Sequence, residues 1–106
     1  MTNSQLKRIL AESGLPVVYH AWPPKRAPEP PYVVFLRTQT AEFYADGKVY
    51  FRKSRYRAEL YTDQKAPAVE VQLERTLDAA GILWKITDEA FLDEEGLYEI
   101  LYEIEV

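Results

Sequence analysis

The 106-residue chain has no cysteine, one histidine, four glycines and no long apolar run. The lack of cysteine excludes a disulfide scaffold, a thiolate zinc site and a cysteine nucleophile. Four glycines cannot supply a phosphate-binding loop, and no segment approaches the roughly 20 apolar residues of a membrane span. Because residues 1–10 also lack the basic-then-apolar pattern of a signal peptide, we expect a domain made in a reducing cytoplasm.

The single histidine, His20, gives no basis for catalysis. No nearby serine or threonine is marked by its surroundings as a nucleophile, and one histidine without cysteine falls short of a metal site. The acidic residues 93–95 could attract a divalent cation, but we interpret them as a solvated turn. Carboxylates brought together by the fold stay open as an alternative. We expect no enzyme activity, no cofactor and no metal.

Charge is divided unevenly along a chain whose composition is that of one folded domain, 47% hydrophobic and 28% charged. Residues 1–62 hold ten Lys/Arg and five Asp/Glu, whereas residues 63–106 hold three and twelve. The net charge of −4 therefore conceals a half of +5 and a half of −9. Eight tyrosines among the aromatic residues favour sheet faces or protein interfaces, because tyrosine joins a large apolar ring to a polar tip.

The first third of the chain predicts a short helix and two strands. Thr2 and Gln5 have the spacing of a capping box, and Gly14 is a typical helix end. Residues 23–31 hold five of the seven prolines, which indicates a rigid connector or, alternatively, a recognition loop for an aromatic groove. The expected elements are a helix over residues 4–13 and strands over residues 17–22 and 32–38.

The remainder predicts a hairpin, a second helix and further strands. Asp46 and Gly47 form a typical hairpin turn between short aromatic strands, after an ambiguous stretch over residues 38–45. Pro67 suits the first turn of a helix that Gly81 ends. Alternation predicts the other strands over residues 55–62, 82–86 and 97–106, with a turn at residues 93–96.

This order of elements contains no internal repeat and no linker, so residues 1–106 read as one domain. Short connections favour antiparallel neighbours. We therefore expect an α+β fold, in which two helices pack on one face of an antiparallel sheet. The last predicted strand agrees, because its alternation leaves one apolar face and one glutamate-rich face.

A basic run with interleaved aromatic residues is the main candidate site. Such strands can bind single-stranded nucleic acid through phosphate contacts and base stacking. The pI of about 5.0 argues against that function, and a solvated outer face or a protein-facing patch are the alternatives. The run consists of Lys48, Arg52, Lys53, Arg55 and Arg57.

An acidic final strand complements this basic run. Its outer positions hold Glu99, Glu103 and Glu105. If the two regions lie on opposite flanks, copies of the chain could pair head to tail and close a ring. If the strands are neighbours, the charges pair within one subunit instead. The sequence leaves both arrangements open.

An ordered set of short motifs extends from residue 17 to residue 103. In order, the motifs are Val17-Val18-Tyr19-His20, Pro30-Pro31-Tyr32-Val33-Val34, Tyr44-Ala45-Asp46, Glu59-Leu60-Tyr61-Thr62-Asp63, Lys65, the helical residues Glu70, Leu73 and Glu74, and Leu97-Tyr98-Glu99-Ile100-Leu101-Tyr102-Glu103. Together with the first helix, they cover nearly the whole chain.

This set resembles the tail terminator, or tail completion, proteins of the head–tail joining region in tailed bacteriophages and prophages. The resemblance implies an α+β subunit that forms a ring, often a hexamer, where the tail tube meets the head. The partners that it implies are further copies of the chain, the tail tube and head-completion proteins, without membrane or nucleic acid. The protein would lie in the bacterial cytoplasm during assembly and then in the tail or neck of the virion. The resemblance carries over no catalytic residue.

Overall fold

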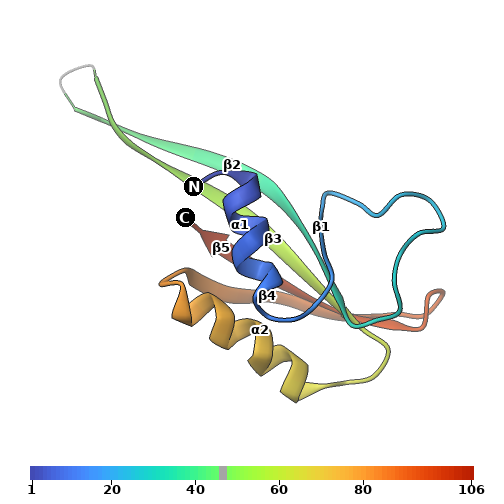
Figure 1. Cartoon of the computed structure of the whole chain (residues 1–106). Helices are drawn as coiled ribbons and strands as arrows, with labels where there is room; N and C mark the ends of the chain where they lie inside the picture. The colour runs from blue at the N-terminus through green and yellow to red at the C-terminus, as the bar shows by residue number, and fades with distance from the viewer. Residues whose placement is uncertain (46–47) are drawn as a thin grey trace.

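The computed structural model describes the backbone of residues 1–45 and 48–106, and the side chains of residues 1–38 and 54–106. Within this described part, five strands form one sheet in the order β1-β2-β3-β5-β4, and both helices lie on one face (Figure 1). The predicted α+β class is confirmed. The elements are α1 (Asn3–Ala11), β1 (Val17–Tyr19), β2 (Tyr32–Ala45), β3 (Lys48–Thr62), α2 (Pro67–Ala79), β4 (Leu83–Leu92) and β5 (Leu97–Glu105).

The sheet is mostly antiparallel, as expected, but its first pair is parallel. β1 runs parallel to β2, with Val17 opposite Val33, whereas the pairs β2–β3, β3–β5 and β4–β5 are antiparallel. A parallel pair needs a long crossover connection. The proline-rich segment over residues 20–31 provides this connection, so it joins two parallel strands rather than two antiparallel ones.

Several element boundaries differ from the sequence prediction. β1 ends at Tyr19 rather than at residue 22, because His20 adopts a φ of +73° that a strand cannot continue. The ambiguous residues 38–45 are strand, and β3 runs unbroken from Lys48 to Thr62. The short strands expected on each side of the turn are therefore parts of two long strands, β2 and β3. The turn predicted at Asp46 and Gly47 lies outside the described residues.

The core lies between the two helices and the inner face of the sheet. From Tyr56 to Thr62 of β3 and from Ile100 to Ile104 of β5, every second residue is buried there, as the period of a strand requires. The buried side chains include Leu6 and Leu10 from α1, Leu73 and Leu77 from α2, and Val33, Phe35, Tyr56, Ala58, Leu60, Ile100, Tyr102 and Ile104 from the sheet. Among the described residues, neither helix is long and apolar enough to cross a membrane.

Two buried tyrosines reach from the sheet to the helices. The hydroxyl of Tyr56 donates to Oδ1 of Asn3, at the start of α1, over 2.5 Å. The hydroxyl of Tyr102 donates to Oε2 of Glu74 in α2 over 2.7 Å. Each tyrosine thus places its ring in the core and satisfies its polar tip at a helix.

A two-stranded arm, made of residues 39–45 of β2 and 48–53 of β3, projects from this body (Figure 1). β5 pairs with β3 only as far as Arg55, and Val106 adds a backbone pair with Ser54; beyond that point β2 and β3 pair with each other alone. The register shifts after Arg37, so a bulge precedes the arm. The radius of gyration is 14.9 Å, against about 13 Å for a compact domain of this length.

Candidate interaction site on the open face of the sheet

The face of the sheet opposite the helices carries the described members of the predicted interface. Positions two apart on a strand share a face, so Arg55 and Arg57 lie on the same face of β3. The register places Arg55 opposite Glu105 and Arg57 opposite Glu103, and Glu99 lies on the same face of β5. The structure therefore brings these five residues together on neighbouring strands of one chain.

Charges on this open face approach one another within the chain. Of the two arrangements that the sequence left open, pairing inside one subunit is present. Exposed pairs of this kind contribute about 0–1 kcal/mol each, so they orient side chains more than they stabilise the fold. The pairs are Arg55 Nε with Glu105 Oε2 at 3.9 Å, Lys85 Nζ with Glu103 Oε1 at 4.0 Å, and Arg57 Nε with Glu59 Oε2 at 3.0 Å.

The other three basic residues belong to the arm. Lys48, Arg52 and Lys53 lie on β3 beyond its pairing with β5, at the end of the sheet that holds Arg55. The structure describes their backbone alone. The predicted basic run is thus divided between an arm and a face where carboxylates already accompany the arginines.

Tyr61 is the centre of a hydrogen-bond network that joins β3 to β5. Its hydroxyl donates to Oε2 of Glu99 at 2.7 Å and lies 3.0 Å from Oε1 of Glu59. Burial, followed by these two carboxylates, raises the pKa of Tyr61 far above its ordinary value. The hydroxyl therefore keeps its proton at physiological pH, and two carboxylates share one donor.

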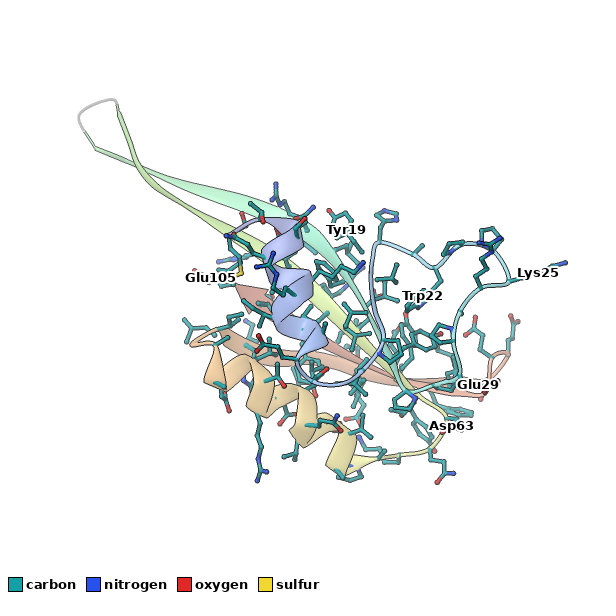
Figure 2. All side chains as sticks on the ribbon, in the orientation of Figure 1. Tyr19, Trp22, Lys25, Glu29, Asp63 and Glu105 are labelled. Atoms are coloured by element: carbon teal, nitrogen blue, oxygen red, sulfur yellow. The ribbon has the colours of Figure 1, made fainter. Side chains whose placement is uncertain are left out.

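Three aromatic rings continue from Tyr61 across the sheet to the proline-rich connector. Tyr61 lies opposite Tyr32 in the register, with ring centroids 5.3 Å apart. The ring of Tyr32 then meets that of Trp22 edge to face at 5.9 Å, a favoured geometry for aromatic pairs. Figure 2 shows Trp22 on the connector after β1, beside the sheet. These contacts hold the connector against the open face.

The three rings line a surface depression of about 310 Å³, here called the aromatic pocket. The indole Nε1 of Trp22 is buried, with no hydrogen-bond partner in the described part of the chain. No lysine or arginine is among the described lining residues, whereas two glutamates are. Burial and then Glu95 raise the pKa of Tyr32. The lining residues are His20, Ala21, Trp22, Tyr32, Val34, Glu59, Tyr61, Leu92, Glu95 and Leu97.

This pocket is suited to a cationic group. Aromatic faces and carboxylates attract a cation. His20 is exposed at the pocket, and the acidic turn that we interpreted as solvated supplies Glu95 to it. Among the described residues, no three His, Asp or Glu side chains are grouped to hold a metal ion.

Sequence reasoning missed the pocket, although part of it was visible. Alternation along β3 places Arg57, Glu59 and Tyr61 on one face, which indicates a polar outer surface. Trp22 follows no period, because it lies on an irregular connector whose path the sequence does not reveal. Only the proline-rich composition marked that connector as a candidate recognition loop.

No known family model matches the chain, and no curated protein sequence matches it either.

Proposed function

We propose that the chain is a structural subunit of the head–tail joining region of a tailed bacteriophage or prophage, and that it acts like a tail terminator by assembling into a ring. The arm is the observation that supports this function best. A two-stranded ribbon is marginally stable in water by itself, yet the described arm continues well beyond the third strand. Its sequence also contains four aromatic residues, Phe43, Tyr44, Tyr50 and Phe51.

Such an arm is expected to pack against another protein surface. The partners that we propose are further copies of the chain, in a ring such as a hexamer, together with the tail tube and head-completion proteins. The chemistry of the described site is also that of a binding surface, since its groups are paired carboxylates, arginines and aromatic rings.

A shortened arm tests this function. Replacing residues 42–52 with Asn-Gly joins two paired positions, Ala41 and Lys53, through a favoured hairpin turn. We expect the natural chain to form closed rings in sedimentation velocity and negative-stain electron microscopy, alone or with a tail tube protein. The shortened chain should stay monomeric, with a circular dichroism spectrum and a cooperative thermal transition that show a folded domain. A natural chain that stays near 12.3 kDa under all these conditions contradicts the proposal.

A small binding module that uses residues 48–57 is the alternative function. Arg57 and Arg55 already lie beside Glu59 and Glu105, so phosphate groups would have to compete with carboxylates, which favours a protein partner over nucleic acid. Binding to single-stranded DNA that weakens steeply with salt would support the nucleic-acid version. No binding at low salt would exclude it.

A further inference from the structure

We propose that the arm of one copy docks in the aromatic pocket of the next copy, with arm cations against the carboxylates and rings of the pocket. This inference rests on the proposed ring assembly and adds to it the two surfaces that meet. It follows from where the two features lie, from their charge and from the aromatic rings of the pocket.

The arm and the pocket lie at opposite ends of the same two strands. β2 enters the sheet at Tyr32 beside the pocket and leaves it in the arm, and β3 runs back from the arm to Tyr61. From Arg52 to Tyr61 the strand covers about 30 Å at the usual rise per residue. Figure 1 shows the arm pointing away from the connector and from the turn between β4 and β5. An arm therefore cannot reach the pocket of its own chain.

The charges of the two ends are complementary. The sequence over residues 39–53 contains three basic residues, Lys48, Arg52 and Lys53, and two acidic ones, Glu42 and Asp46, so its net charge is positive. The pocket is lined by Glu59 and Glu95, and the turn beside it adds Asp93 and Glu94. Opposite charges at opposite ends favour head-to-tail contact, which closes into a ring when the rotation between copies allows it.

The pocket offers specific contacts to such an arm. A lysine or arginine side chain can lie over the rings of Trp22, Tyr32 and Tyr61 beside Glu95, whose carboxylate is exposed. Such a side chain comes from a strand of the arm, so the aromatic pocket would hold it while the strand lies across the pocket mouth.

Charge reversal in two variants tests the pairing. One variant, Glu95→Lys, reverses the pocket, and the other, Arg52→Glu with Lys53→Glu, reverses the arm. Each alone should raise the dissociation constant for self-association about tenfold or more, because like charges then meet. An equimolar mixture should restore assembly, because in the mixture every contact between the two variants joins opposite charges. Sedimentation velocity over a concentration series measures the association of each variant and of their mixture.

Matched controls reverse one charge on α1 and one directly after it, far from the arm and the pocket in the sequence. Glu12→Lys and Lys7→Glu change exposed residues and should leave assembly unchanged; circular dichroism shows that each variant is folded. If both charge-reversed variants assemble like the natural chain, or if their mixture fails to recover, the arm–pocket contact is wrong while ring assembly stands. A natural chain that never associates overturns both proposals.

Discussion

At the scale of single residues, Gly81 shows how one position ends α2 and starts the next strand. Its φ of +70° lies in the left-handed region, which glycine enters without strain. The Gly81 N–H donates to the carbonyl of Asp78, and the Ile82 N–H donates to that of Leu77. This pattern is a Schellman motif, and it satisfies two carbonyls that the helix end would otherwise leave unpaired.

Gly81→Ala should therefore destabilise the protein by about 1 kcal/mol. The cost comes from the backbone, because no described atom beyond the two neighbouring residues lies within 4 Å of where the new Cβ would stand. Urea unfolding measures the change, and Gly81→Asn should cost less, since asparagine tolerates this conformation better. Equal losses in the two variants would contradict the backbone explanation.

At the scale of elements, the sheet holds each helix through a tyrosine as well as through apolar packing. Tyr102 lies in β5 between Ala58 of β3 and Ile86 of β4, and its hydroxyl is the group that reaches Glu74 in α2. A hydrogen bond to a carboxylate contributes more to stability than one between neutral groups. The bond therefore helps to set where α2 lies on the sheet.

Tyr102→Phe should lower the free energy of unfolding by about 1–2 kcal/mol, because it removes this bond and keeps the ring. Glu74→Gln keeps an acceptor without its charge and should cost less. Chemical denaturation of the two single variants and the double variant gives the coupling energy. A coupling energy near zero would show that the contact does not stabilise α2.

Elements with a strong period were predictable from the sequence, and those that depend on a connector were not. The helix after Pro67 and the strand from Leu97 follow their periods closely, and both form as predicted. The parallel pairing of β1 was not predictable, since it depends on the path of the connector. The same holds for the pocket, because Trp22 reaches Tyr32 only through that path.

At the scale of the whole molecule, the half-buried Tyr61 and the buried Tyr102 make the free energy of unfolding depend on pH in the alkaline range. Burial, with hydrogen bonds to Glu99 and Glu74, raises the pKa values of Tyr61 and Tyr102 in the folded protein. An unfolded chain ionises its tyrosines near pH 10. Above that pH the unfolded state loses protons that the folded state retains, so the free energy of unfolding falls as pH rises.

We therefore expect tyrosine ionisation to leave the urea midpoint unchanged below about pH 9 and to lower it from about pH 10 upward. Tyr61→Phe and Tyr102→Phe should each make the decline shallower, and the double variant should do so most. Absorbance at 295 nm follows tyrosine ionisation in the same samples. A decline of equal slope in all four proteins would show that other groups cause it.

The pairing of β3 with β5 also determines when the chain can finish folding during its synthesis. Tyr56 pairs with Ile104 across the whole of α2 and β4, and contacts so distant in sequence form slowly, because a long loop must close first. β5 leaves the ribosome after the other four strands, so the edge of β3 that it covers stays unpaired until β5 emerges. Until then, that edge is an unpaired strand edge of the kind that can pair with other chains.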